Sequence, residues 1–433
     1  MIMKLFSLRL TTLKSKLYAI VFASFIVRVV AFFQLPETVS FLGPDEGNYG
    51  ELTKWIAKGE PANEYPYATL YISSRALIFP ATLLNRLGIG GLDSVRIIAS
   101  IYGLFTAILV TCFFLKLQKA RTEVSSFIAH NQNKSLILMA IFIFLPSNLI
   151  WSILGLRESA LMFWVLVVFI LIYHVITGEK NPSKLALGGI LIAIPLVFSS
   201  RPQVGLVLGV TLLVYLFFRL KIKAAQILFP LVLVASFLGF AITTATSTQT
   251  EQTDKTFVES GIRLGNPGSV ILNQVDRLSF QYEVNKVDAE SAIETQACPN
   301  AGTSRFDNYF CTAYRAPFTT YTFLIRPMLG TDVTSSSSLF AAIENTFWLG
   351  AFLFVVFMLI RNRRLAFFEP LLPSLLFFSI YSVAAGAYEG NMGTAFRHKS
   401  LILWVVLLLL ASTVVATQQR KAEREGIFGS SQE

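Results

Sequence analysis

The chain has 433 residues, of which 54% are hydrophobic and only 14% are charged, and its mean hydropathy is +0.60. A soluble domain carries about 25% charged residues, so this composition excludes an ordinary soluble protein and predicts one embedded in a membrane. The formal net charge of +10 does not indicate nucleic-acid binding, because much of the excess lies in short segments between hydrophobic stretches. The sequence carries no zinc-finger, P-loop, nucleotide-binding or haem motif.

Hydrophobic stretches long enough to cross a bilayer recur along the chain. A transmembrane helix needs about 20 predominantly apolar residues. The first stretch is longer than a signal-peptide core and lacks a clear small-residue cleavage site, so we predict that it is retained as a span. The pattern predicts an all-α polytopic membrane protein with about ten transmembrane helices. The predicted helices cover residues 17–36, 93–116, 135–152, 158–177, 185–200, 203–219, 224–245, 338–360, 366–385 and 400–417.

The segment 37–92, directly after the first span, begins with two adjacent carboxylates, Asp45 and Glu46. Ionisable groups at membrane depth are costly and tend to mark function. The alternative is an ordinary helix N-terminus, where carboxylates favour the helix dipole. Apolar residues then recur at helical spacing as far as Gly59, which predicts a short helix at the membrane surface. Residues 69–90 are interrupted by charges and a proline, and predict an interfacial or re-entrant helix.

The distribution of Lys and Arg predicts the orientation of the spans. If the N-terminus is cytoplasmic, the short basic segments, such as the run Arg361–Arg364, all fall on the inside. Both termini are then cytoplasmic, in the cytoplasmic (plasma) membrane. The predicted parts are an N-terminal transmembrane module 1–245 containing the outside loop 37–92, a large outside loop 246–337, transmembrane helices in 338–417, and a cytoplasmic tail 418–433.

The three cysteines divide between these parts. Cys298 and Cys311 lie in the large outside loop, where an oxidising compartment favours a disulfide between them. Two free thiols are the alternative. Cys112 lies within a predicted span, and we expect it to be a core residue.

Unusual polar residues collect on the predicted outside face, at the ends of the spans. The set comprises Asp45, Glu46, Arg157, Glu158, Arg201, Arg326, Glu344, Arg397, His398 and Lys399. Carboxylates and basic groups that converge on one face of a membrane protein indicate a site for an anionic substrate.

The motifs around these residues resemble the GT-C superfamily of membrane glycosyltransferases, near the protein mannosyltransferase and lipid A aminoarabinose transferase group. Many members open with one span, an Asp-Glu pair, a Tyr three residues on and a surface helix that ends in Gly. The matching residues here are Asp45, Glu46, Tyr49 and Gly59. Three further segments also look similar, namely SILGLRESALMFW with Glu158, GLDSVRIIASIYGLFTA and the late NMGTAFRHKSLILW. The resemblance therefore covers most of residues 20–220 and the end 386–417.

The resemblance implies a transferase that takes a sugar from a polyprenyl-phosphate donor. It implies Asp45 as the base that deprotonates the acceptor, with Glu46 orienting the acceptor. Arg397 and His398, with Arg201 as a further residue, suit the donor phosphate. Tyr49 and Glu158 complete the predicted substrate site. No cofactor is required by the resemblance, although Asp45, Glu46 and Glu158 offer three carboxylates to a divalent metal.

Two other functions fit parts of this pattern. An O-antigen-type polymerase or ligase is also polytopic with a large outside loop, but gives no reason for an acidic pair after the first span. A lipid-linked-sugar transporter or flippase often shows internal repeats and interrupted helices at the membrane midplane, and this sequence has no repeat. The expected partners are membrane lipid, the lipid-linked sugar, and a glycan, lipid or protein acceptor.

Overall fold

A computed structural model gives the fold of the chain. It describes residues 13–38, 45–66, 70–71, 74–119, 137, 139–177, 184–220, 223–250, 305–333, 335–361, 372–388 and 392–424. No strand occurs in these ranges. The helices are α2 (Leu13–Gln34), α3 (Asp45–Ala57), η1 (Ala62–Glu64), α5 (Arg75–Arg86), α6 (Gly91–Lys119), α8 (Pro146–Ile153), α9 (Arg157–Thr177), α10 (Lys184–Ser200), α11 (Pro202–Phe217), α12 (Lys223–Thr250), α14 (Arg305–Ile325), α15 (Ser336–Arg361), α16 (Leu372–Tyr388) and α17 (Met392–Arg424).

The helices confirm the predicted class, a helical polytopic membrane protein. In the described ranges five helices are long and apolar enough to cross a membrane, and they contain Ser15–Gln34, Gly91–Phe113, Arg157–Ile176, Lys223–Ala241 and Ser338–Met358. Three shorter apolar helices accompany them, namely α10, α11 and α16. The last predicted span, 400–417, lies within α17.

The predicted span 135–152 is wrong as a continuous helix. The helix is interrupted at Leu145, whose ψ is 134°, and α8 begins at Pro146. Proline has no N–H to donate and disfavours the helical conformation in the residue before it, so the chain restarts there. The segment predicted as a large outside loop, 246–337, contains the helix α14, which packs against α16.

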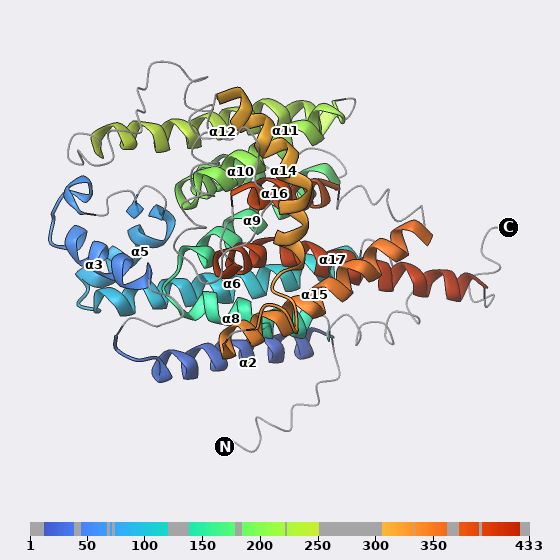
Figure 1. The fold of residues 1–433 in the computed structure, drawn as a ribbon, viewed down its shortest axis with the longest axis horizontal. Helices are drawn as coiled ribbons and strands as arrows, with labels where there is room; N and C mark the ends of the chain where they lie inside the picture. The colour runs from blue at the N-terminus through green and yellow to red at the C-terminus, as the bar shows by residue number, and fades with distance from the viewer. Residues whose placement is uncertain are drawn as a thin grey trace.

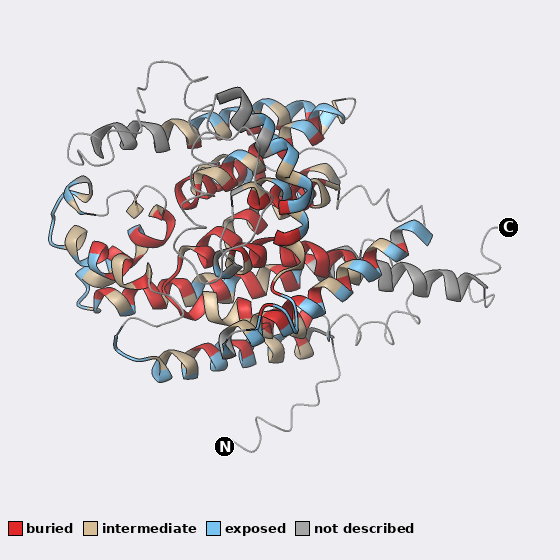
Figure 2. Ribbon diagram, in the orientation of Figure 1, coloured by how far each residue is buried: buried red, intermediate tan, exposed pale blue. Residues whose placement is uncertain are grey.

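The helices form a bundle with one elaborated end (Figure 1). Most helices run along the long axis of the view, with α10, α11 and α12 on one side and α2, α6, α8, α15 and α17 on the other. The short helices α3 and α5 lie together at the left-hand end, and they contact each other and α6. We refer to this end as the loop end. Buried residues fill the middle of the bundle around α9 and the first half of α17 (Figure 2).

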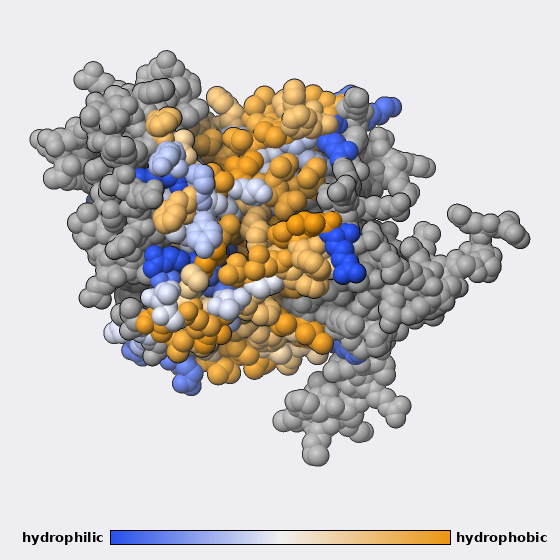
Figure 3. Space-filling view, turned by 45° about the vertical axis from the view of Figure 1, so that its right-hand side comes forward, coloured by the Kyte–Doolittle hydropathy of each residue, from blue (hydrophilic) through white to orange (hydrophobic). Residues whose placement is uncertain are grey.

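The outer surface of the bundle is apolar, as contact with lipid requires. In Figure 3 hydrophobic residues dominate the described surface, and hydrophilic residues gather toward its left and right margins. Helix α2 exposes Tyr18, Phe22, Val30 and Phe33. Cys112 is also exposed, so its predicted place in the core is wrong. Its side chain points away from the bundle, where an apolar thiol is tolerated as readily as in a core.

Glycine lets three helices approach closely around one aromatic side chain. The buried ring of Phe198 on α10 lies between Gly205 on α11 and Gly239 on α12. A Cβ added at Gly205 would lie 2.5 Å from Cγ and 2.9 Å from Cα of Phe198, and one at Gly239 would lie 2.6 Å from Cδ2. Small residues at such crossings are how membrane helices gain van der Waals contact.

We therefore expect Gly205→Ala to destabilise the protein by about 1–3 kcal/mol, the range for overpacking a core. Gly188→Ala, in α10 where an added Cβ would meet nothing within 4 Å, is the matched control. It should leave stability unchanged or raise it, because alanine is the better helix former by about 1 kcal/mol. Thermal unfolding of the purified protein in detergent measures both, and equal melting temperatures for the two variants would contradict this packing.

Candidate functional site

A buried ion pair fixes the first loop to the bundle. Both oxygens of Glu46 accept hydrogen bonds from Arg96 on α6, at 2.7 Å from Nη2 to Oε1 and 3.1 Å from Nε to Oε2. Arg96 also donates to the carbonyls of Pro36 and Thr38, at 2.7 and 3.1 Å. The N–H of Gly155, just before α9, donates to Glu46 at 3.2 Å. Glu46 is 0% exposed and Arg96 is 2% exposed.

This geometry changes the role expected for Glu46. The sequence predicts that it acts beside Asp45, on the acceptor or a metal. In the structure its carboxylate is enclosed and both of its oxygens are engaged, so it supports the site without facing it. We describe Glu46 and Arg96 together as the loop anchor.

One arginine bridges the two remaining carboxylates of the site. Nη1 of Arg397 lies 3.0 Å from Oδ2 of Asp45, and Nε of Arg397 lies 3.1 Å from Oε1 of Glu158. These contacts join α3, α9 and α17, which are far apart in sequence. The two carboxylates differ in environment, because the side chain of Asp45 is 41% exposed and that of Glu158 only 7%.

Two further arginines surround Glu158. Nη1 of Arg201 lies 3.7 Å from Oε1 of Glu158, and Nε of Arg157 lies 4.0 Å from the same oxygen. Arg157 was part of the polar set in the sequence but was not among the predicted site residues. We refer to Asp45, Glu158, Arg157, Arg201 and Arg397 as the charge cluster. It brings three further predicted site residues, Glu158, Arg201 and Arg397, into one group with Asp45.

His398 lies next to Arg201, one residue of the charge cluster. It is buried, its Nε2 contacts Nη1 of Arg201, and its backbone carbonyl accepts a bond of 3.4 Å from the hydroxyl of Tyr381. The Arg201 contact places His398 next to the charge cluster, and the prediction that His398 binds the donor phosphate together with Arg397 stays a prediction.

Tyr49 is also enclosed. Burial raises the pKa of Tyr49, with the nearby charge of Arg157 acting in the opposite direction, so its hydroxyl keeps its proton at physiological pH. Its ring belongs to the same buried apolar cluster as Ala76 and Leu77 of α5. Tyr49 thus helps to pack α3 against α5, and its predicted contact with substrate stays a prediction.

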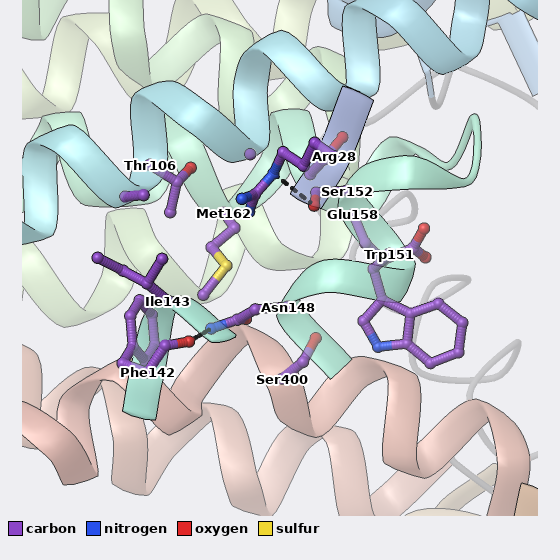
Figure 4. A pocket seen from close by; sticks show the side chains of 13 residues that line it. Arg28, Thr106, Phe142, Ile143, Asn148, Trp151, Ser152, Glu158, Met162 and Ser400 are labelled. Carbon is purple, nitrogen blue, oxygen red and sulfur yellow. Dashed lines mark hydrogen bonds between the residues drawn. The ribbon is translucent and has the colours of Figure 1, made fainter. Parts of the chain in front are cut away.

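A cavity extends from Glu158 into the bundle (Figure 4). Arg28 of α2 turns its guanidinium toward it and donates from Nε to Oγ of Ser152 at 3.1 Å. A charged residue inside the first span marks Arg28 in the sequence as unusual. The sequence leaves open whether Arg28 pairs with a carboxylate or lines a cavity. The lining residues are Arg28, Gly103, Thr106, Ala107, Phe142, Ile143, Asn148, Trp151, Ser152, Glu158, Ser159, Met162 and Ser400.

A second buried polar group joins the late helices. Nζ of Lys399 donates to Oδ1 of Asn345 at 2.6 Å and to the carbonyls of Leu324 and Arg326 at 3.0 and 2.7 Å. Lys399 thereby ties α17 to α15 and to the end of α14. Glu344, on α15, accepts a 3.0 Å bond from the N–H of Ser147. These residues have their partners within the protein, which indicates a structural role.

The three carboxylates predicted as possible metal ligands do not face a common point. Within the described part of the chain no group of three His, Cys, Asp or Glu side chains is placed to hold a metal. Asp45, Glu46 and Glu158 are neighbours, but Glu46 faces Arg96 and the other two face Arg397. The predicted disulfide lies outside the described residues, since neither Cys298 nor the side chain of Cys311 is among them.

Comparison with known proteins finds similarity at the level of structure. No protein-family model and no curated protein matches the chain. Archaeal oligosaccharyltransferase AglB from Archaeoglobus fulgidus, solved with an inhibitory peptide and a dolichol-phosphate, is similar over 96% of this chain, with a TM-score of 0.49 and 13% identity. ArnT from Cupriavidus metallidurans, in the apo state, is similar over 92% of this chain, with a TM-score of 0.37 and 13% identity.

The chain spans about half the length of AglB, 52%, and 77% of ArnT. At 13% identity the structural similarity assigns no role to any residue of this chain. The residue roles discussed below are argued from the contacts within this chain.

We expect loss of the buried ion pair of the loop anchor to cost much more stability than loss of a surface ion pair. Glu46→Gln leaves Arg96 as a buried charge without its partner, so we expect a loss of about 3–5 kcal/mol of stability. Lys54→Ala removes the exposed pair that Lys54 forms with Glu51, 2.7 Å apart, and should cost about 0–1 kcal/mol. Thermal unfolding in detergent compares them. Wild-type stability in Glu46→Gln would show that the anchor does not hold the loop.

Proposed function

We propose that this chain is an integral-membrane glycosyltransferase that moves a sugar from a polyprenyl-phosphate donor to a glycan, lipid or protein acceptor, on the extracytoplasmic face of the membrane. The observation that carries the proposal is the sharing of Arg397 between a half-exposed carboxylate, Asp45, and a buried one, Glu158. The fold-level comparison supports the general class, and the donor, acceptor and mechanism are our inference.

The charge cluster favours an anionic ligand. Three arginine side chains, those of Arg157, Arg201 and Arg397, lie within 4.0 Å of the carboxylate of Glu158, and Arg397 also contacts Asp45. Guanidinium groups gathered in this way bind phosphate through short charge-assisted hydrogen bonds.

The two contacts of Arg397 differ in how easily a ligand displaces them. Its Nε contact is with the buried Glu158, which two other arginines also hold. Its Nη1 contact is with the half-exposed Asp45, whose charge water screens more than that of the buried Glu158. A donor phosphate can therefore take Nη1 from Asp45 while Glu158 keeps the arginine in place. The same movement frees an oxygen of Asp45 beside the bound donor.

Asp45 then suits the role of general base. It takes the proton of the acceptor hydroxyl, whose oxygen forms the new bond to the anomeric carbon of the sugar as the bond from that carbon to the phosphate oxygen breaks. The electron pair leaves on the prenyl phosphate, and Arg397 neutralises the developing charge. A single displacement of this kind inverts the anomeric configuration and needs one carboxylate.

We expect Asp45→Asn to abolish transfer while the protein still folds and inserts. The amide keeps the shape of the side chain and cannot accept the proton, and loss of a general base typically costs about 10²–10⁴-fold in rate. The test is mass spectrometry of lipid-linked and envelope glycans in cells lacking their own copy of the gene and complemented with either form. Glycans identical to those of the wild type would remove Asp45 from catalysis. If the purified wild-type protein transfers sugar in detergent and Asp45→Asn does not, the transporter alternative is excluded, because a detergent micelle has no two sides to transport between.

We expect Arg397→Lys to weaken donor use by roughly 10- to 100-fold, equivalent to about 1.5–3 kcal/mol for a charge-assisted contact. Lysine keeps the charge but cannot bridge Asp45 and Glu158 with separate nitrogens. The loss should appear as a higher KM for the donor, with little change for the acceptor. Arg86→Lys, at the exposed end of α5, is the control. Unchanged donor kinetics in Arg397→Lys would move the phosphate contact toward Arg201.

A further inference from the structure

Helix α14 turns a row of aromatic side chains away from the bundle. Phe310, Tyr314, Phe318 and Tyr321 are each 47–66% exposed. Their spacing of four, four and three residues places them on one face of the helix, within an arc of about 80°. We refer to these four residues as the aromatic stripe. Among the α14 residues whose exposure the structure describes, no exposed residue is charged.

The face of α14 that is turned toward the bundle carries hydroxyl groups beside the ring of Phe323. Thr319 and Thr322 are buried, and their hydroxyls donate to carbonyls of α14 itself, at 3.2 Å to Arg315 and 2.9 Å to Thr319. A helix that lies between a protein and water has its apolar side chains inward and its polar ones outward. The opposite arrangement in α14 indicates that its outer face meets apolar surroundings.

Close packing and hydrogen bonds fix the direction in which the aromatic stripe points. A Cβ added at Gly386 of α16 would lie 2.8 Å from Cα of Thr320, so the two helices are in backbone contact. Nζ of Lys399 and Nδ2 of Asn345 together donate to the four carbonyl oxygens of residues 324–327. The carbonyls at a helix end otherwise lack partners, so these bonds hold the end of α14 in place.

The end of α14 lies on the loop-end side of the bundle. Lys399, which binds it, follows Arg397 by two residues, and Arg397 contacts Asp45 of α3. In Figure 1 α14 runs across the long axis that most helices follow. It has 21 residues, enough to cross a bilayer, but it is not among the helices that are apolar enough to do so. Its position and direction suit a helix that lies along the membrane surface.

The chemistry of the aromatic stripe matches the boundary between lipid headgroups and acyl chains. Phenylalanine rings favour hydrocarbon, whereas each tyrosine adds a hydroxyl that needs a polar partner. Tyrosine is enriched where a bilayer meets water, because the two ends of its side chain suit the two sides of that boundary. The stripe also continues an apolar surface, since α15, which contacts α14, begins with the exposed residues Leu339, Phe340 and Ile343.

We propose that α14 is an interfacial helix, which lies in the membrane surface on the side of the loop end and buries the aromatic stripe among phospholipids, between headgroups and acyl chains. Part of the segment predicted as an outside loop, 246–337, is then in contact with lipid. Because Lys399 ties α14 to the helix that carries Arg397, the charge cluster is held close to the level of the headgroups. The inference goes beyond the proposed function and does not depend on it.

The test measures the depth of the aromatic stripe in the full-length protein, reconstituted in phosphatidylcholine nanodiscs. A fluorescent amino acid replaces Tyr314 or Phe318 by codon suppression. It replaces Phe347, exposed midway along the candidate span Ser338–Met358, in one control and Glu60, exposed at the loop end, in the other. The quenchers are phospholipid brominated near the headgroup, phospholipid brominated near the end of the acyl chain, and iodide in the water.

We expect bromine near the headgroup to quench the label at Tyr314 and Phe318 most strongly. The label at Phe347 should lose most fluorescence to bromine near the chain end, and the label at Glu60 to iodide. Because the stripe is exposed, both stripe variants should keep the melting temperature of the wild type.

Four results would overturn the proposal. Quenching of the stripe by iodide as strong as at Glu60 would show that it faces water. Quenching that matches Phe347 would show that α14 lies in the hydrocarbon core. Protection from all three quenchers would show that protein, such as a second copy of the chain, covers the stripe. A lower melting temperature for both stripe variants would show that these side chains are packed within the protein.

Discussion

The hydrogen-bonded ion pair of Glu46 and Arg96 is the constraint on which the site depends. It closes a contact between a loop that follows the first span and the helix α6, and it reaches the start of α9 through the N–H of Gly155. Because α3 begins at Asp45, fixing Glu46 also fixes the residue before it. The half-exposed carboxylate that faces Arg397 is thus positioned by its buried neighbour.

The adjacent carboxylates of Asp45 and Glu46 consequently have different roles. Consecutive residues of an α-helix point about 100° apart, so Asp45 and Glu46 cannot share one environment. Glu46 faces the protein and meets an arginine that satisfies both oxygens. Asp45 faces the opening and meets an arginine that a ligand can displace. This division explains why the pair contributes one candidate catalytic residue and one supporting residue.

The sequence predicts most of the spans, because hydrophobic length is a local property that lipid makes necessary. It predicts the polar face for the same reason, since each of those residues stands at the end of an apolar run. It does not predict the break at Pro146 or the helix α14, which is too polar to register as a span and whose packing on α16 depends on tertiary contacts. Which charged residues pair with each other is likewise decided by residues far apart in the sequence. No pattern in the sequence tells that Arg96 belongs to Glu46, or that Arg28 bonds to Ser152, because these facts depend on residues 50 or more positions away.

The distance along the chain between Arg28 and Ser152 has a consequence for biosynthesis. The two residues are 124 positions apart, so at about 5–20 residues per second the partner follows roughly 6–25 s after the arginine. During that interval α2 must remain in the bilayer with a charge that opposes insertion by about 2.5–3.5 kcal/mol. The mainly apolar sequence on both sides of Arg28, rich in Phe, Val and Ile, offsets this charge until α8 is synthesised. The large exposed apolar side chains of α2 therefore serve the nascent chain as well as the finished bundle.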